Sequence, residues 1–263
     1  MFALTNCRIH SADKCLEGHA VLIAGRHIVD IVEATDIPGD IPRHDLEGGH
    51  LAPGFIDVQV NGGGGVMFNA APTAQTIARI AGAHRRFGTV GFLATLITDD
   101  RARIAEAIDA VRQALAARTP GLLGIHLEGP TINPQRRGMH ARRHIGALDA
   151  EDIARLAALP AARVVTLAPE CAAPGLIAQL TAAGIRVSAG HTEATAEQMA
   201  AAQKAGLAGV THLFNAMSQF QGRAPGAVGA ALADGDLWCG IIADGVHVHE
   251  KSILAAWRAK PDK

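Results

Sequence analysis

Three side chains that can bind a metal each lie at the end of a short apolar run. They are Glu128, His191 and His212, and their runs are 121–128, 185–191 and 209–212. Apolar runs of this length bounded by Gly or Pro are typical of buried strands. Side chains at the ends of separate parallel strands meet at one edge of a barrel sheet. One carboxylate and two imidazoles suit zinc with an open position for water, so we expect one divalent metal ion here, Zn²⁺.

Such a metal ion would allow amide hydrolysis at neutral pH. It polarises a carbonyl group and lowers the pKa of bound water from about 15.7 to about 7. The alternative is that Glu128 is a salt-bridge partner and each histidine a hydrogen-bonded core residue. Their joint occurrence at three strand ends favours the metal site. The same donor set also accepts Fe, Co and Mn, so the identity of the metal stays open.

The composition excludes several classes of function. Charged residues are 19% and hydrophobic residues 49% of the 263, which is ordinary for a globular protein. The net charge is -1 and there is no basic block, so we expect neither a nucleic acid nor a membrane partner. Residues 1–10 lack the apolar core of a signal peptide. The four cysteines are scattered, without a C-x-x-C pair, so we expect reduced thiols in a cytoplasmic protein.

The chain divides into two parts of different character. In residues 1–50, alternating runs at 20–24 and 26–32 flank Gly25 and predict a hairpin. This part is expected to be a small β-sandwich-like domain. Residues 51–263 alternate apolar runs with Ala-rich segments of helical period. Strands are expected at 51–60, 90–97, 122–128, 164–168, 186–191, 209–212 and 238–244. Helices are expected at 73–87, 99–118, 149–159 (with Asp149 as N-cap), 174–183, 194–205 and 249–259, with a long loop between 212 and 238.

These elements make seven β/α units. Strands that alternate with helices at this spacing predict a parallel sheet, and right-handed crossovers curl such a sheet into a barrel. We therefore expect an α/β fold, a TIM-like (β/α) barrel with seven of its eight units. The eighth unit would follow Lys263.

Several motifs occur in an order that resembles the N-acetylglucosamine-6-phosphate deacetylases of the amidohydrolase superfamily. They are PGFIDVQVNG at 53–62, HLEGP at 126–130, SAGH at 188–191, THLFNAM at 211–217, GR at 222–223 and IADGVH at 242–247. The resemblance covers essentially the whole chain. It implies a barrel of the metal-dependent amidohydrolase type and removal of acetate from N-acetylglucosamine 6-phosphate, giving glucosamine 6-phosphate in amino-sugar catabolism. It also implies a phosphosugar as the small-molecule partner, and a homodimer when the protein is full length.

The resemblance also implies roles for individual residues. His140 would donate a hydrogen bond to the acetyl carbonyl oxygen as this oxygen becomes anionic; the alternative is an exposed loop histidine. Arg223 and His247 would bind the phosphate, although Arg223 alone could equally be a solvated loop arginine. The residues implied in substrate binding are Gln59, Asn61, Met139, His140, Asn215, Ala216, Arg223, Asp244 and His247.

Gln59 and Asn61 bear on the number of metal ions. Relatives in the wider superfamily often carry two histidines at the end of the first strand, where they bind a second metal. An amide is a poor zinc ligand beside imidazole, so we expect one metal in the main site. Gln59 could hydrogen-bond a water, or both amides could only satisfy buried backbone. His126 has the same parity as Glu128 and is expected inside the barrel.

The resemblance has one departure. The family's catalytic Asp lies at the end of the eighth strand, whereas this chain ends in the polar residues 261–263, and Asp262 does not match that Asp. We therefore expect a C-terminally truncated family member that lacks the general-base Asp. Asp57 and Asp244 are fallback bases. The alternative function is a catalytically incompetent fragment that binds metal or phosphosugar only, and another N-acetylated amino sugar phosphate is a further possible substrate.

Overall fold

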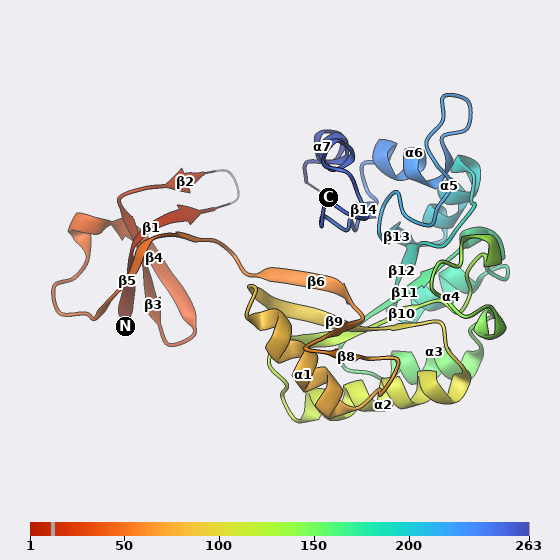
Figure 1. Ribbon diagram of the computed structural model, residues 1–263, viewed down its shortest axis with the longest axis horizontal. Coiled ribbons are helices and arrows are strands. Elements are labelled where there is room, and N and C mark those ends of the chain that lie inside the picture. The colour runs from red at the N-terminus through yellow and green to blue at the C-terminus, as the bar shows by residue number, and fades with distance from the viewer. Residues whose placement is uncertain (12–13, 263) are drawn as a thin grey trace. The chain divides into compact units, whose positions relative to one another are not determined.

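The computed structural model describes residues 1–11 and 14–262 (Figure 1). The chain forms two compact units, Met1–Phe55 and Ile56–Lys263. No helix in the described residues is long and apolar enough to span a membrane.

The N-terminal unit is one five-stranded sheet. The predicted hairpin is present as two antiparallel strands that turn at Gly25. Three further strands, which the sequence pattern did not indicate, complete the sheet, in the order β2-β1-β3-β4 with β5 parallel to β1. The strands are β1 (Phe2–His10), β2 (Cys15–Leu16), β3 (His19–Ala24), β4 (His27–Glu33) and β5 (Arg43–Leu51).

The C-terminal unit contains the seven predicted β/α units. Its sheet runs in chain order from β6 to β14, and the neighbouring pairs from β9 to β14 are parallel. In Figure 1 the strands curl around one side of the unit, with the helices outside. The strands are β6 (Phe55–Val60), β9 (Thr89–Ile97), β10 (Leu122–Glu128), β11 (Ala162–Leu167), β12 (Arg186–Ala189), β13 (Leu207–Val210) and β14 (Trp238–Cys239). The helices are α1 (Ala74–Arg85), α2 (Arg101–Ala116), α3 (Ala150–Ala157), α4 (Leu176–Ala182), α5 (Ala196–Lys204), α6 (Gly226–Ala233) and α7 (Glu250–Ala259).

Apolar side chains on both sides of the strands hold this sheet. Phe92, Leu96 and Ile125 are at most 2% exposed, as expected for strands covered on both faces. The helices present apolar stripes to them, such as Ile104, Ile108 and Val111 of α2. Side-chain caps fix where the helices begin, and the predicted N-cap Asp149 forms a capping box with Asp152. The strand ends are thereby held in register at the edge where the predicted ligands lie.

The strands expected at 51–60, 186–191 and 209–212 have other bounds in the structure, Phe55–Val60, Arg186–Ala189 and Leu207–Val210. Two further elements differ more. Helix α6 lies where a long loop was predicted; its sequence, GAVGAALA, is buried on most sides and so shows no helical alternation of apolar and polar residues. Strand β14 ends at Cys239 although the apolar run continues to Asp244. After Cys239 the chain turns towards the loop after β13, since Leu213 N–H donates to the carbonyl of Gly240 at 2.7 Å.

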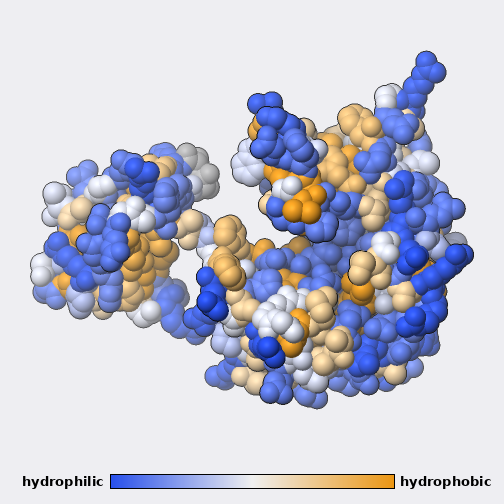
Figure 2. Space-filling view, viewed as in Figure 1, coloured by the Kyte–Doolittle hydropathy of each residue, from blue (hydrophilic) through white to orange (hydrophobic). Residues whose placement is uncertain are grey.

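The sheet is open between β6 and β14. These two edge strands expose Phe55, Ile56, Val58 and Trp238. A cavity of about 440 Å³ lies between them, lined by Asp57, Gln59 and His126 on one side and by Trp238 and Ile241 on the other. Figure 2 shows hydrophobic and hydrophilic residues side by side around the hollow of this unit.

Candidate metal centre

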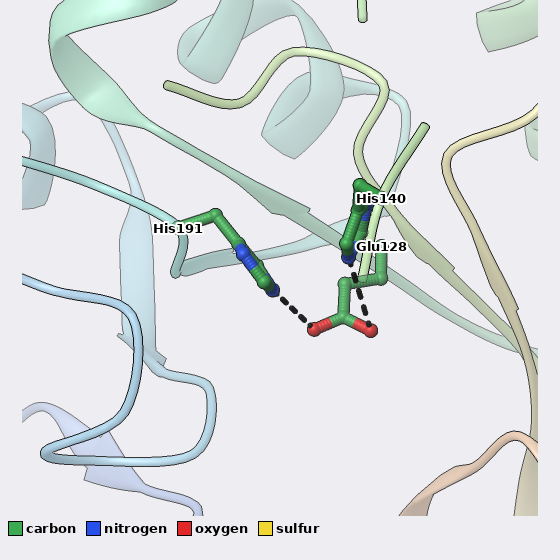
Figure 3. A group of neighbouring side chains, drawn as sticks. All are labelled: Glu128, His140 and His191. Carbon is green, nitrogen blue, oxygen red and sulfur yellow. Dashed lines mark hydrogen bonds and ion pairs between the residues drawn. The ribbon is translucent and has the colours of Figure 1, made fainter. Parts of the chain in front are cut away.

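Four buried side chains converge at the C-terminal ends of neighbouring strands. Glu128 is the last residue of β10, His191 follows β12, His212 follows β13, and His140 comes from the loop after β10. Figure 3 shows His191 and His140 directed at the Glu128 carboxylate. Glu128 Oε1 lies 3.0 Å from His191 Nε2 and 2.9 Å from His212 Nε2, and these two nitrogens are 3.1 Å apart. The structure thus brings the three predicted ligands together.

Backbone carbonyls fix which ring nitrogen carries the proton in both ligand histidines. His191 Nδ1 lies 2.7 Å from the carbonyl oxygen of Arg136, and His212 Nδ1 lies 3.1 Å from that of Asn215. A carbonyl oxygen can only accept, so each Nδ1 must be the donor, and Nε2 of a neutral ring is then a bare acceptor. Three acceptor atoms within 3.1 Å of one another repel unless a positive charge lies among them. Either extra protons or a metal cation must supply it.

The spacing of these atoms fits a small divalent metal ion. Bonds of about 2.0–2.2 Å from zinc to nitrogen or oxygen place tetrahedral ligand atoms about 3.3 Å apart. The three observed separations are 2.9, 3.0 and 3.1 Å, so a metal ion would be accommodated by outward shifts of a few tenths of an ångström. In the described residues, a second cluster that could hold a metal is the more exposed group Asp99, Asp100 and His144.

Glu128 is suited to a ligand role because it stays ionised. Burial raises its pKa, but hydrogen bonds from His191 and His212, together with the charges of His212 and His126, outweigh burial and hold the pKa well below its usual value. Gln59 adds a further donor, with its Nε2 3.1 Å from Glu128 Oε1. Gln59 therefore contacts a ligand carboxylate.

Two of the three amides implied in substrate binding carry unsatisfied donors. The side-chain Nδ2 atoms of Asn61 and Asn215 are shielded from solvent and have no hydrogen-bond partner. A buried donor without a partner costs about 1–3 kcal/mol. Both atoms are therefore available to donate a hydrogen bond to a bound ligand or water.

The backbone around the ligands is strained. His191, His212, Phe214 and Ala216 have φ values of 50°, 42°, 78° and 50°, in the left-handed region that non-glycine residues rarely adopt. Each such residue costs about 1–3 kcal/mol and persists only when its surroundings enforce it. Hydrogen bonds do so here, including Thr192 N–H to Ala216 O at 3.0 Å and Asn133 N–H to His191 O at 2.9 Å.

His140 presents a neutral N–H to the centre. Its Nδ1 accepts from the backbone N–H of Thr98 at 3.3 Å and faces the Thr98 hydroxyl at 2.7 Å, so the proton of a neutral ring lies on Nε2. Nε2 lies 3.9 Å from Glu128 Oε2. Burial, followed by the charge of His191, lowers the pKa of His140 to about 4. The side chain can therefore donate a hydrogen bond at neutral pH.

We expect His140 to remain in this neutral tautomer throughout the range from pH 8 to 5. A ¹⁵N-imidazole NMR titration of the metal-loaded protein would measure it, since metal charge can only lower this pKa further. The pKa of His140 is about 4 in the folded protein, against 6.5 for an unperturbed histidine, so the unfolded chain takes up this proton first as the pH falls. The free energy of unfolding should therefore be unaffected by His140 above pH 6.5 and decrease as the pH drops from 6.5 towards 4. A protonated His140 at pH 6 would contradict the assignment.

The other implied substrate residues lie on exposed loops. Met139 is 90% exposed. Asp244 accepts from His247 Nδ1 at 2.6 Å and from two backbone N–H groups, and these hydrogen bonds lower the pKa of Asp244 to about 2. Arg223 lines a separate cavity of about 390 Å³ together with Arg136 and Glu193. None of the four converging side chains lines that cavity.

A series of hydrogen-bonded polar side chains lies inside the barrel, and the sequence predicted only its first member, His126. His126, expected inside the barrel, donates from Nδ1 to Val58 O at 2.8 Å, and its Nε2 lies 2.7 Å from Thr166 Oγ1. The hydroxyl of Thr166 continues to Thr211 at 2.7 Å, and Thr211 to Ser188 at 2.7 Å. Hydroxyl residues near the ends of successive apolar runs are the sequence signal for such a chain.

A parallel barrel sheet with a buried carboxylate and two imidazoles at its strand ends defines the class of metal-dependent barrel hydrolases. Comparison with known proteins agrees. Residues 50–261 match the model of the amidohydrolase family, and residues 1–51 match that of the NagA composite domain. The chain belongs to the amidohydrolase family.

Its relatives within that family are amino-sugar phosphate deacetylases. An N-acetylgalactosamine-6-phosphate deacetylase of Shewanella sp. (strain ANA-3) is 47% identical over 84% of this chain and 56% of the relative. An N-acetylglucosamine-6-phosphate deacetylase of Haemophilus influenzae is 35% identical over 100% of this chain and 69% of the relative. The crystal structure of N-acetylglucosamine-6-phosphate deacetylase from Pasteurella multocida superposes with a TM-score of 0.93 at 35% identity, covering 100% of this chain and 69% of that one. The chain thus spans between 56% and 69% of the length of these relatives.

Proposed function

We propose that this chain provides the metal centre for hydrolysis of the acetamide of N-acetylglucosamine 6-phosphate, giving glucosamine 6-phosphate and acetate in amino-sugar catabolism. One observation carries the proposal: the converged carboxylate and two imidazoles whose Nδ1 protons are fixed by backbone carbonyls. The family and the relatives' activities support it. We further propose that the site holds one divalent metal ion, Zn²⁺, that the protein is cytoplasmic, and that the full-length form is a homodimer.

The residues of the chain divide the chemistry among them. When bound, the metal ion supplies Lewis acidity to the carbonyl and to water. Glu128, His191 and His212 hold it, and Gln59 fixes the Glu128 carboxylate. His140 donates its Nε2 proton in a hydrogen bond to the acetyl oxygen as negative charge develops there, which makes it a catalytic residue.

A carboxylate must also move a proton from water to the leaving amine. Of the two fallback bases, Asp244 is the weaker because its pKa of about 2 and its three hydrogen bonds leave it little affinity for a proton. Asp57 is half-buried, lines the cavity beside Gln59, and accepts one backbone hydrogen bond, from Gln59 N at 2.9 Å. The resemblance assigns this step instead to an Asp on an eighth strand.

Substrate binding would use the buried amides and the exposed loops. The unsatisfied donors of Asn61 and Asn215, with Ala216 beside Asn215, suit the hydroxyl and acetamide oxygens of a sugar. Arg223 and His247 would bind the phosphate, because a guanidinium engages two phosphate oxygens at once. Met139, next to His140, would contact the sugar.

The relative from Shewanella favours a second candidate, N-acetylgalactosamine 6-phosphate. The two substrates differ in the configuration of one hydroxyl, and a site that hydrogen-bonds that hydroxyl discriminates strongly. We expect one of the two 6-phosphates to be hydrolysed faster, and both faster than the sugars without phosphate. Acetate release from the four compounds under identical conditions would measure this. Equal rates with and without phosphate would contradict the phosphosugar assignment.

The decisive experiment is acetate release with added Zn²⁺ by the chain and by a version extended by the eighth strand that the resemblance implies. Activity of either form supports the proposed hydrolysis. Stoichiometric Zn²⁺ binding without turnover in both forms would favour the alternative, a catalytically incompetent fragment that binds metal or phosphosugar only. Failure of both forms to bind Zn²⁺ would overturn the metal centre.

A further inference from the structure

A carboxylate that does not contact the metal centre lies at the junction of the loops that form it. Glu170 belongs to the short helix η4 (Pro169–Cys171), which follows β11. Strand β11 lies between β10 and β12, the two strands that lead to Glu128 and His191 (Figure 1). The side chain of Glu170 is half-buried.

Glu170 accepts hydrogen bonds from two loops at once. Its Oε1 accepts from Asn133 Nδ2 at 2.9 Å and from the backbone N–H of Glu193 at 2.6 Å. Its Oε2 accepts from the Thr192 hydroxyl. Asn133 belongs to the loop after β10, whereas Thr192 and Glu193 directly follow the ligand His191. One carboxylate thus joins the β10 loop to the turn that presents His191.

The loop after β10 also contacts His191 itself, at two points. The backbone N–H of Asn133 donates to His191 O at 2.9 Å, and the carbonyl of Arg136 in the same loop accepts from His191 Nδ1 at 2.7 Å. The side chain of Arg136 also pairs with Glu193. Moving either loop relative to the other would therefore rotate the imidazole and weaken the contact that fixes its proton.

The turn needs such an anchor because its backbone is strained. His191 has a φ of 50°, and this conformation persists only if neighbouring contacts enforce it. The hydroxyl of Thr192 also accepts from Ala194 N–H at 2.9 Å, so the Thr192 proton is free to point at Glu170. Hydrogen bonds to an ionised carboxylate are stronger than those between neutral groups. Glu170 therefore accepts two such bonds from the strained turn, at Thr192 and Glu193, and a third from Asn133 in the loop after β10.

We propose that Glu170 is a positioning residue for the metal centre, holding His191 in the orientation that directs Nε2 at Glu128. This inference rests on the proposed metal site and deepens it. Glu170 acts through Asn133 and the 192–193 backbone, so its loss should change the affinity and geometry of the metal site while all three ligands remain.

The test is metal affinity, measured on the purified chain by competition between the protein and a chromophoric chelator for Zn²⁺. Removing a partner outside the ligand shell typically lowers metal affinity about 10–100-fold, and we expect Glu170→Ala to fall in that range. Glu170→Gln keeps the shape and one accepting oxygen, so it should retain more affinity than the alanine variant. The absorption spectrum of Co²⁺ bound in place of Zn²⁺ should shift in both variants.

A matched control is Asp234→Asn. Asp234 is a loop carboxylate that accepts from the backbone N–H groups of Asp236 at 2.7 Å and Leu237 at 3.2 Å, after helix α6. Its replacement should lower thermal stability without altering Zn²⁺ affinity or the Co²⁺ spectrum. A merely structural role for Glu170 would make its variants behave in the same way.

Wild-type Zn²⁺ affinity and an unchanged Co²⁺ spectrum in Glu170→Ala would overturn the proposal, even if the variant were less stable. Should the alanine variant fail to fold, the same measurements on Glu170→Gln decide the question. Failure of the metal site itself would be recognised separately, because the unsubstituted chain would then show no specific Zn²⁺ binding.

Discussion

Replacing Glu128 by glutamine is expected to abolish specific metal binding. Glu128 Oε1 is the atom on which both histidine Nε2 atoms converge, at 3.0 and 2.9 Å. An amide carries no negative charge and is a poor zinc ligand. Loss of a residue that only hydrogen-bonds a ligand lowers metal affinity up to ~100-fold, and loss of the ligand Glu128 should lower the affinity for Zn²⁺ by more than that. Metal content after dialysis and competition with a chelator would measure the loss.

The same variant is expected to gain or retain stability in the absence of metal. Without a cation, the buried negative charge of Glu128 is stabilised by hydrogen bonds from the two histidines and requires them. A neutral glutamine removes that requirement at almost the same volume. Asp57→Asn is a matched control, since Asp57 is a carboxylate on β6 that accepts from Gln59 N. Full metal occupancy in Glu128→Gln would remove Glu128 from the ligand set.

Replacing His140 by alanine should lower turnover about 10²–10³-fold while leaving the metal content unchanged. The expected loss is that of one hydrogen-bond donor to an oxyanion. His140 suits this role because its Nε2 proton faces the centre and its pKa of about 4 keeps the ring neutral. Acetate release and metal analysis on the same preparation, in whichever form of the protein is active, would separate the two effects.

His144→Ala serves as the control for this change. His144 lies in the same loop, and its Nε2 is 3.7 Å from Asp99, away from the four converging side chains. Its loss should leave turnover near the starting value. An undiminished rate in His140→Ala would show that another group stabilises the oxyanion, and reduced metal content would show that His140 acts as a ligand.

Much of the arrangement could be predicted from the sequence because strand ends are visible in it. Glu128, His191 and His212 each close an apolar run, and parallel strands bring such ends together. The same rule would have drawn attention to Glu170, which lies just after the run 164–168. The alternation of apolar runs with amphipathic segments likewise predicted the seven β/α units.

Other features could not be predicted from the sequence. Helix α6 is apolar on nearly every side and shows no period, and β14 ends inside an apolar run because the chain leaves the sheet after Cys239. The histidine protons are fixed by the backbone carbonyls of Arg136 and Asn215. Every residue type has such a carbonyl, so these contacts cannot be predicted from the sequence. The distance between Arg223 and any site also depends on loop conformation, which the sequence does not specify.

Those two carbonyl contacts bear on how the centre tolerates evolutionary change. Since the accepting atoms belong to the main chain, substitutions at positions 136 and 215 leave them in place as long as the loops keep their path. Insertions or deletions in either loop would displace them. Among family members, the segments that lead from 128 to 136 and from 212 to 215 are therefore expected to keep a constant length.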